Sequence, residues 1–348
     1  MKYALVTGSA GLVGGEAVDH LCLEGFSVVG IDNDFRSIFF GPTSSTSWNT
    51  KRLVNLYSSF EFNNIDIRDY EKMKEIFKKQ SFELIIHTAA QPSHDWAAKD
   101  PLLDFSINAN GTLNLLELTR LYSPEATFIF TSTNKVYGNT PNFLNLIEQD
   151  LRFDLPNSHR FWQGIDESMS IDNSTHSLFG VSKCSADLLV QEYGRYFNLR
   201  TGVFRGGCLT GPMHSSTELH GFLSYLVKSI VLRKNYKIFG YKGKQVRDNL
   251  HANDLISMFM EFHKNPKSGE VYNVGGGREN SISIIEAIKL IELNSGSSAI
   301  TEYQEVNRTG DHKWYITNLS KFKSHYPNWK LNHPLEQIIT EMVKSVRV

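Results

Sequence analysis

Three glycines near the N-terminus have the spacing of a nucleotide-binding turn. The stretch Gly8-Ser-Ala-Gly11-Leu-Val-Gly14 follows a short apolar run, Tyr3–Thr7, and a helical pattern begins directly after it. Glycines permit a tight turn and close approach of the backbone to a pyrophosphate, and the N-terminus of the following helix supplies amide donors. The pattern predicts a dinucleotide site. Its expected contacts are Gly8, Ala10, Gly11, Leu12, Val13 and Gly14.

An acidic residue at the end of the next expected strand favours NAD over NADP. The stretch from Gly25 to Asp32 is predicted to be that strand, and Asp32 lies about 20 residues beyond the glycine turn. A carboxylate there can accept from both ribose hydroxyls and would repel a 2′-phosphate. Arg36 leaves NADP open, because a nearby arginine can bind that phosphate. A strand–helix turn with no ligand is a further interpretation. Asn33 and Arg36 are also expected to line the cofactor.

The elements that must position these residues alternate between strand and helix patterns. Further strands are predicted at Phe60–Asp66, Glu83–Ala90, Ala126–Thr133 and Arg200–Gly206, and helices at Tyr70–Lys79, Pro101–Tyr122 and Ser182–Phe197. This alternation is typical of a doubly wound parallel sheet, so the expected fold class is α/β.

The domain organisation is expected to be a Rossmann domain followed by a smaller one. Residues 1–207 are predicted to form the NAD-binding domain, with insertions near 35–49 and 139–170. Loops of this length in compact domains are usually functional or mobile. Residues 208–348 are predicted to be mostly an α/β substrate-binding domain, with some segments returning to the Rossmann core. Its expected helices are Leu219–Arg233, Ile282–Leu293 and Leu335–Val346.

Composition excludes several classes of protein. The chain has 348 residues, 41% of them hydrophobic, which is enough for a large core. A net charge of −1 without a long basic run does not favour nucleic-acid binding. Three widely spaced cysteines, Cys22, Cys184 and Cys208, are typical of reduced cytosolic thiols. With no signal-peptide pattern and no apolar stretch of about 18 residues, we expect a cytoplasmic protein without metal or membrane partners.

Motifs along nearly the whole chain carry a family resemblance. They are the Gly8–Gly14 turn, Asp66-Ile67, His87-Thr-Ala-Ala90, Asn108, Thr131–Gly138, Lys183, Phe204-Arg205, Val246–Asp254 and Arg308–Asp311. Together they resemble the extended short-chain dehydrogenases/reductases of the nucleotide-sugar epimerase/dehydratase family. The stretches Ser132–Gly138, Gly243–Asp248 and Asp166-Glu-Ser resemble the CDP-paratose (CDP-tyvelose) 2-epimerase branch most.

The resemblance implies that NAD acts as a transient hydride store. Asp66 and Ile67 would bind the adenine, and Ala89 and Ala90 would be small because the cofactor lies across their strand end. The full set of further cofactor residues that it implies is Asp66, Ile67, Ala89, Ala90, Gln91, Asn108, Thr131, Lys183 and Phe204. For Asn108, a structural role in binding the backbone is the favoured interpretation.

The resemblance also implies a nucleotide-diphosphate sugar substrate, with a CDP-linked sugar favoured. Arg247 and Arg308 match phosphate-binding positions of related epimerases, and planar guanidinium forks suit phosphate oxygens. Arg205 is expected to be structural. The other residues expected at the substrate are Gln91, His94, Thr133, Asn134, Lys135, Cys208, Leu219 and His220.

The stretch HSLFGVSK, residues 176–183, lacks the usual base of the family. The resemblance implies a tyrosine four residues before Lys183, with Lys183 holding the nicotinamide ribose and Thr133 bonding the reacting hydroxyl. Phe179 stands there and has no proton to exchange. Three interpretations are open: a substitution introduced to trap a complex, a natural change with the proton transfer moved elsewhere, or a non-catalytic protein that binds NAD and a nucleotide sugar. The second is favoured, because this stretch resembles a branch of epimerase-like sequences with phenylalanine here.

Lys135 is the residue to which the sequence assigns the proton transfer. It follows Thr133 by two positions at the end of a strand, where ligands of α/β proteins bind. Burial beside a positive nicotinamide would favour its neutral form. A simple ion pair with an acid or phosphate is the alternative. The resemblance implies Asp-Glu at the positions of Asn134 and Lys135 in 4,6-dehydratases, so that reaction is disfavoured.

The predicted function is NAD-dependent epimerisation of a nucleotide-diphosphate sugar through a transient ketone. The alternatives are a nucleotide-sugar dehydrogenase or dehydratase of other regiochemistry, and a non-catalytic binding protein. A homodimer is also implied, in which Pro101–Tyr122 and Ser182–Phe197 pair with their copies. Apolar positions that could serve this contact are Leu113, Leu116, Leu188 and Leu189.

Overall fold

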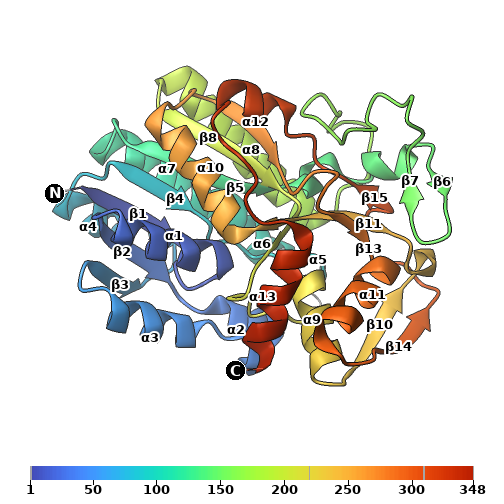
Figure 1. The fold of residues 1–348 in the computed structure, drawn as a ribbon. Helices are drawn as coiled ribbons and strands as arrows, with labels where there is room; N and C mark the ends of the chain where they lie inside the picture. The colour runs from blue at the N-terminus through green and yellow to red at the C-terminus, as the bar shows by residue number, and fades with distance from the viewer. Residues whose placement is uncertain (1, 219, 309, 348) are drawn as a thin grey trace. The chain divides into compact units, whose positions relative to one another are not determined.

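The chain folds as two compact units. The structure is a computed structural model that describes residues 2–218, 220–308 and 310–347. The first unit is built from Met1–Val136, Leu178–Arg205 and Leu255–Tyr272, and the second from Tyr137–Ser177, Gly206–Asp254 and Asn273–Val348 (Figure 1). Each unit is therefore assembled from segments that lie far apart in the sequence.

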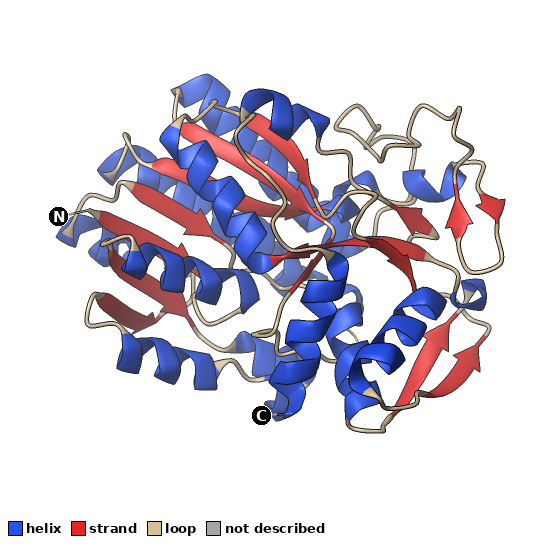
Figure 2. Cartoon of the chain, in the orientation of Figure 1, coloured by secondary structure: helices blue, strands red, loops and turns tan. Residues whose placement is uncertain are grey.

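A sheet with parallel pairing forms the centre of the first unit (Figure 2). Its order is β12-β8-β5-β4-β1-β2-β3. The strands are β1 (Tyr3–Thr7), β2 (Ser27–Asp32), β3 (Phe60–Asn64), β4 (Leu84–His87), β5 (Thr127–Thr133), β8 (Arg200–Gly206) and β12 (Glu270–Val274). Leu5 of β1 lies opposite Val29 of β2 on one side and Ile85 of β4 on the other, both in parallel register. The chain order reverses beside β1, which confirms the doubly wound α/β fold and places the ligand end at the carboxyl ends of these strands.

Helices cover both faces of this sheet (Figure 1). On one face α1 (Leu12–Leu23) packs beside α3 (Ser47–Leu56), and on the other α7 (Gly111–Tyr122) packs between α4 (Tyr70–Lys79) and α8 (Leu178–Phe197). The second face buries a continuous apolar core that includes Leu115, Phe128 and Val190. The remaining helices of this unit are α2 (Phe35–Phe40), η1 (Pro42–Ser44), α5 (His94–Lys99), α6 (Pro101–Phe105), η2 (Ser106–Asn110) and α10 (Ala252–Lys264).

The long helix expected over Pro101–Tyr122 is interrupted. Helix α6 leads into a π-helical turn, η2, before α7 begins. Asn108 lies in this turn and is 2% exposed. Its amide donates to the carbonyl of Gln91 (3.1 Å) and accepts from the Gln91 N–H (2.9 Å). The turn thus brings a buried polar side chain to the backbone after β4, in line with the occurrence of π-turns at functional sites.

The excursion at 35–49 forms short helices that support the glycine turn. The Asp34 carboxylate accepts from Ser45 Oγ (2.6 Å) and the Thr46 N–H (2.9 Å), which closes the excursion on itself. Asn49 is buried and donates from Nδ2 to the Ala10 carbonyl at 3.0 Å. This segment is therefore part of the framework of the nucleotide turn.

The second unit is organised around β11 (Val246–His251). This strand pairs antiparallel with β13 (Ser281–Ser283) and parallel with β9 (Cys208–Thr210) and β15 (Trp314–Tyr315). A separate parallel pair joins β10 (Asn235–Phe239) to β14 (Ile300–Gln304). Its helices α9 (Phe222–Val231), α11 (Ile284–Ser295) and α13 (Leu335–Arg347) pack together over an apolar core that includes Leu226, Ile291 and Ile338. The shorter elements of this unit are η4 (Thr140–Phe143), β6 (Ile147–Glu148), β7 (Phe153–Asp154), η5 (Tyr241–Gly243) and α12 (Ser320–His325). The turn η3 (Asn134–Tyr137) begins in the first unit and ends at the first residue of the second.

The chain passes from the first unit to the second between Arg205 and Gly206, near the expected boundary at residue 207. The insertion expected in the first domain near 139–170 lies within Tyr137–Ser177, which groups with the second unit. Two ion pairs hold this segment there: Arg278 to Asp154 (2.9 Å) and Arg152 to Glu286 (2.7 Å). The segment Leu255–Tyr272 belongs to the first unit. In the part of the chain that is described, no helix has the length and apolar character needed to cross a bilayer.

A buried ion pair fixes α8 to the sheet. Asp187 on α8 is 0% exposed and accepts from Nε (2.9 Å) and Nη2 (2.8 Å) of Arg205 on β8. It also accepts from Ser132 Oγ on β5 at 2.6 Å. Three elements therefore meet at one carboxylate, and Arg205 has the structural role that the sequence indicates.

Asp187→Ala should lower the free energy of unfolding by about 3–5 kcal/mol, because it leaves the Arg205 charge buried without its partner. Chemical denaturation checks this value. Glu192→Ala, at an exposed position of the same helix, is the matched control and should change stability by no more than about 0.5 kcal/mol. A loss below about 1 kcal/mol for Asp187→Ala would show that α8 does not depend on this pair.

Candidate active site

The glycine turn is required by close backbone packing. Gly8 has φ +69°, and its N–H donates to the Ile31 carbonyl at 2.8 Å. A Cβ on Gly8 would lie 2.8 Å from the Ala89 nitrogen, and a Cβ on Gly14 would lie 2.0 Å from the Gly8 carbonyl oxygen. Larger residues at these two positions would therefore push the start of α1 away from β1 and β4. The small residue Ala89 matches this packing.

Asp32 lies beside the turn at the end of β2. Its Oδ2 accepts from the Ala10 N–H at 3.0 Å and its Oδ1 from the Asp34 N–H at 2.8 Å. Burial raises the pKa of this carboxyl group. Each carboxylate oxygen has a second lone pair, so the group can still accept from ribose hydroxyls. The backbone donors fix its orientation before any ligand arrives.

Two arginines lie near the expected adenosine end. Arg68 forms an ion pair with Asp66 at 2.6 Å. Burial alone would raise the pKa of Asp66, but the hydrogen bonds that its carboxylate accepts from Arg68 lower it below the ordinary value. Arg36 lies over the Phe40 ring at 4.9 Å, and burial lowers the pKa of its guanidinium to about 10, so it remains charged at neutral pH. Ile67 is buried against Gly111. Asn33 accepts from the Phe35 N–H at 3.3 Å.

Lys183 is buried on α8 at the carboxyl end of the sheet. It is 4% exposed, donates from Nζ to the Thr131 carbonyl at 2.8 Å and lies over the Phe130 ring at 4.1 Å. Burial lowers its pKa to about 7, against the favourable charges of Asp187 and Asp104. The Thr131 Oγ1 is buried and has no hydrogen-bond partner among the described residues. This pair offers a cation and a hydroxyl to a ligand.

The position of the family tyrosine is filled by a buried ring. Phe179 is 7% exposed and contacts the His94 ring edge to face, with centroids 5.1 Å apart. Thr133 ends β5, and its Oγ1 accepts from the Lys135 N–H at 3.2 Å. Asn134 is buried and Lys135 partly buried. The catalytic assignment of Thr133, Lys135 and Lys183 stays a prediction, and the sequence had no signal for the His94–Phe179 contact.

Three residues expected at the cofactor have buried side chains that contact other parts of the protein. Phe204 is 0% exposed and packs against Phe259, Phe262 and Tyr272, so its side chain has no surface to offer a ligand. Gln91 is 1% exposed, with Nε2 donating to Asp104 Oδ1 (2.7 Å) and Oε1 accepting from the Ser93 N–H.

The Asn108 side-chain amide is also fully hydrogen-bonded. Besides its bonds with the Gln91 backbone, its Nδ2 donates to Asp104 Oδ1 and to Ser182 Oγ, at 3.0 Å each. Burial and internal hydrogen bonding give these three side chains structural roles, as the sequence favoured for Asn108, and contact of these residues with a ligand stays a prediction. They hold the loop after β4 against α8.

The two arginines predicted to bind phosphate, Arg247 and Arg308, lie in the second unit and are connected through Asp311. Arg247 is 8% exposed, pairs with the Asp311 carboxylate and donates to the Val246 carbonyl at 2.7 Å. The Asp311 N–H donates to the Arg308 carbonyl at 3.2 Å. Arg308 itself donates to the Glu218 carbonyl at 2.7 Å. Asp311 can hold Arg247 in place until a phosphate competes for it.

The other predicted substrate residues of this unit are less informative. Cys208 begins β9 and lies opposite Asn249 of β11. His220 exchanges backbone hydrogen bonds with Thr217 (3.0 and 3.1 Å), and its ring contacts that of His214 at 5.5 Å. Leu219 lies outside the described residues. These assignments stay predictions.

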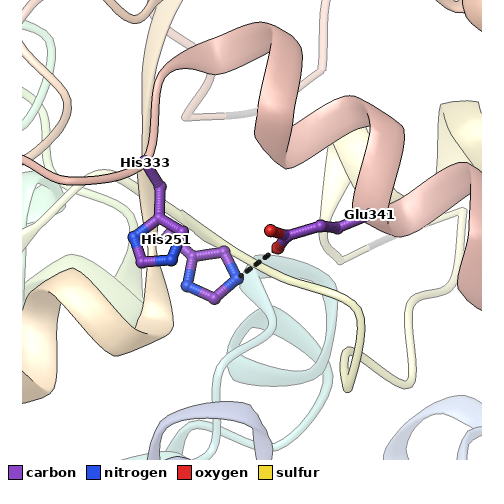
Figure 3. Close-up of side chains that lie close together, drawn as sticks. All are labelled: His251, His333 and Glu341. Atoms are coloured by element: carbon purple, nitrogen blue, oxygen red, sulfur yellow. Dashed lines mark ion pairs between the residues drawn. The ribbon is translucent and has the colours of Figure 1, made fainter.

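A cluster in the second unit combines residue types that can hold a metal (Figure 3). The rings of His251 and His333 stack at 4.2 Å, and His251 Nε2 lies 3.4 Å from Glu341 Oε2. The Asn253 N–H donates to His251 Nδ1 at 3.1 Å, so a neutral ring carries its proton on Nε2, facing the carboxylate. His333 Nδ1 lies 3.0 Å from Asp254 Oδ1. This arrangement suits an ion-pair cluster that attaches α13 to β11.

Comparison with known proteins identifies the family. The sequence model of the NAD dependent epimerase/dehydratase family matches residues 4–275, which is most of the chain. The chain belongs to this family. CDP-paratose 2-epimerase from Salmonella typhi is 34% identical over 298 residues, covering 83% of both sequences. UDP-glucuronate 4-epimerase from Thermodesulfobacterium geofontis is 29% identical over the full length of both.

Solved structures of relatives share the fold. UDP-glucose 4-epimerase from Thermus thermophilus, in complex with NAD, gives a TM-score of 0.79 at 22% identity over 99% of both chains. A tyrosine-to-phenylalanine variant of UDP-glucuronic acid 4-epimerase from Bacillus cereus, in complex with UDP-4-deoxy-4-fluoro-glucuronic acid and NAD, gives 0.76 at 26% identity over 99% of both. The predicted family, fold and NAD cofactor are thereby confirmed.

The first unit fits NAD on its own geometry. The turn admits no Cβ at Gly8 or Gly14, and a partly buried carboxylate oriented by backbone donors stands at the end of β2. Lys183 and Thr131 present polar atoms near the end of β5. The Gly8–Gly14 turn would hold the pyrophosphate and Asp32 the adenosine ribose. Lys183 and Thr131 would hold the nicotinamide ribose. Bound there, NAD would supply reversible hydride transfer.

Stability of NAD-free protein should report the Lys183 pKa. Because the folded pKa of about 7 lies below the ordinary value of 10.5, the unfolded chain binds a proton that the folded chain lacks between these pH values. Lys183 therefore makes the free energy of unfolding rise with pH in this window. Relative to Lys183→Met, the original protein should gain about 2–3 kcal/mol from pH 7 to pH 9 in urea unfolding. Lys264→Met, at an exposed lysine, is the control. A pH-independent difference would contradict the lowered pKa.

Proposed function

We propose that this protein is an NAD-dependent epimerase that inverts carbon 2 of a CDP-linked deoxy sugar such as CDP-paratose. The observation that carries the proposal is the 34% identity to CDP-paratose 2-epimerase over 83% of both sequences, which exceeds the 29% identity to UDP-glucuronate 4-epimerase. The motifs Ser132–Gly138 and Gly243–Asp248 support the same branch. Asn134 and Lys135 argue against a 4,6-dehydratase, since they provide no acid pair.

The proposal assigns each unit its own part of the substrate. In the first unit, Thr133 orients the reacting hydroxyl, and Lys183 fixes the nicotinamide ribose from its buried position on α8. Lys135 remains near by as a candidate for proton transfer. In the second unit, Arg247 and Arg308 bind the pyrophosphate, with Asp311 releasing Arg247 to the phosphate oxygens. After the hydride is removed, the keto sugar must rotate so that the hydride returns to the opposite face of the carbon. Because the hydride is returned, the reaction has no net redox change.

The favoured account of Phe179 is a natural change with the proton transfer moved to another residue. The tyrosine-to-phenylalanine variant of UDP-glucuronic acid 4-epimerase holds both NAD and a UDP-sugar. This supports ligand binding by a protein that lacks one such hydroxyl. General acid–base catalysis contributes about 10²–10⁴ in rate, so a working epimerase needs another group for the proton.

The direct test is a panel of CDP-, UDP-, dTDP- and GDP-sugars incubated with the NAD-loaded protein. We expect CDP-paratose to reach an equilibrium with its carbon-2 epimer, observed by proton NMR. No NADH should accumulate at 340 nm, and no deuterium should enter the carbon skeleton at carbon 2 from D₂O. Lys183→Met is the matched negative control. Stoichiometric NADH would identify a dehydrogenase, loss of water a dehydratase, and binding without turnover a non-catalytic protein.

We also propose that the protein is a homodimer, through α6 and α8. The two helices pack together and expose an apolar patch, defined by Leu102 (84% exposed), Phe105 (43%), Leu178 (47%), Val181 (44%) and Leu188 (49%). The three residues on α8 recur at helical spacing along one face. Of the positions that the sequence indicated, Leu116 is buried in the core, whereas Leu188 is in the patch. A second copy of the same patch would cover this surface.

Light scattering at micromolar concentration should give the mass of a dimer for the original protein. The double change Val181→Glu and Leu188→Glu should give a monomer, because it places charges in the apolar contact. Leu23→Glu, at a position on α1 that is 76% exposed, is the control and should leave the dimer intact. A monomer mass for the original protein would exclude this assembly.

A further inference from the structure

The imidazole of His94 stands against the ring that replaces the family tyrosine. His94 begins α5, and its ring meets that of Phe179 edge to face with centroids 5.1 Å apart and planes at 70°. The Phe179 side chain is buried, while His94 is partly exposed. A titratable group with access to solvent therefore borders the place where the relatives of this chain have their hydroxyl.

The loop that carries His94 is held firmly against α8. Gln91 and Asn108 exchange backbone and side-chain hydrogen bonds, and Asn108 continues to Ser182 on α8 at 3.0 Å. Ser93 caps α5 through the Trp96 N–H at 3.3 Å. The Trp96 indole N–H donates to the Phe39 carbonyl. These contacts hold the backbone from which the His94 ring reaches Phe179, and a catalytic group needs a fixed support of this kind.

The chemistry of imidazole suits the missing step. Its ordinary pKa of about 6.5 lets it act as base and acid near neutral pH, whereas a phenyl ring can do neither. Proton transfer needs a group close to both the reacting hydroxyl and the end of β5. Lys183 on the same helix as Phe179 is engaged with the Thr131 carbonyl. His94 is the titratable side chain shown in direct contact with Phe179.

We propose that His94 takes the place of the family tyrosine as the acid–base group. This inference rests on the proposed epimerase function. His94 would remove the hydroxyl proton of the sugar while the carbon–hydrogen bond breaks, and NAD held by the first unit would be the oxidant that accepts the hydride, so the carbon–oxygen bond becomes double. The imidazolium returns the proton to oxygen when hydride comes back to the opposite face of the carbon. Atoms and charge balance with NAD as the hydride acceptor and donor, and the cycle has no net redox change.

The first test compares three variants on the sugar nucleotide that the original protein epimerises. His94→Gln and His94→Phe should each lose about 10²–10⁴ in turnover, with bound NAD and the unfolding midpoint retained. His94→Phe keeps an aromatic ring against Phe179, so a shared loss isolates the ring nitrogens. Ala98→Ser, at an exposed position of the same helix, is the matched control and should stay within about tenfold of the original. Turnover kept by either His94 variant would overturn the proposal, and so would an equally large loss in Ala98→Ser.

The second test is rescue. Phe179→Tyr in the His94→Gln background should recover at least about tenfold, because it restores a titratable hydroxyl beside Lys183. The same change in the original protein should alter turnover little. A large gain there would mean that the tyrosine was simply missing and that His94 has no such role. Absence of rescue, with the double variant folded and loaded with NAD, would also count against it.

A readout independent of turnover checks the contact. In ¹³C-histidine protein, the His94 ring signal is identified by its loss in His94→Gln. Phe179→Leu should shift that signal by removing the ring current, and added sugar nucleotide should shift it as well. An unmoved signal in either case would refute the placement. Failure of the function itself would look different: the original protein would turn over no sugar nucleotide in the panel, and the inference would fall with it.

Discussion

Two buried charges on α8 organise the first unit. Asp187 joins the helix to Arg205 on β8 and Ser132 on β5, and Lys183, one turn earlier, reaches the Thr131 carbonyl at the end of β5. Unpaired charges in such surroundings would be strongly unfavourable, so the helix has one register in which both are satisfied. That register places Phe179 and Lys183 at the carboxyl end of the sheet, where the ligands of α/β proteins bind.

A second buried network extends this control to the neighbouring loop. Asn108, Asp104 and Gln91 bind one another, and Asn108 reaches Ser182 of α8. The π-helical turn that interrupts the expected long helix provides the position of Asn108. The loop after β4, and with it His94, is consequently fixed to the helix that carries Phe179. Residues that looked like ligand contacts by resemblance are the supports that set the geometry of the site.

The two parts of the proposed reaction depend on different kinds of structure. NAD recognition rests on backbone geometry at Gly8 and Gly14 and on one carboxylate, Asp32, which is oriented by backbone donors. In the proposal, sugar-nucleotide recognition would rest instead on side-chain pairs that a ligand can rearrange, such as Arg247 with Asp311. This difference matches the comparisons: solved relatives named for different sugars are in complex with NAD, whereas the curated relatives are named for CDP- and UDP-sugars. The cofactor is therefore settled at the family level, while the substrate needs an experiment.

The sequence by itself determined the fold class, the cofactor and most elements, because these follow from local patterns. Helix α4 and strand β8 have the predicted bounds. The Gly8–Gly14 turn and Asp32 predict NAD, and the match to an NAD-dependent family confirms this cofactor. Only the tertiary structure decided the roles of individual polar side chains. Gln91 and Phe204 became structural, Asn49 proved to support the turn, and His94 met Phe179. These outcomes depend on burial and on contacts between residues far apart in the chain, and hydrophobic periodicity and motif spacing carry no information about them.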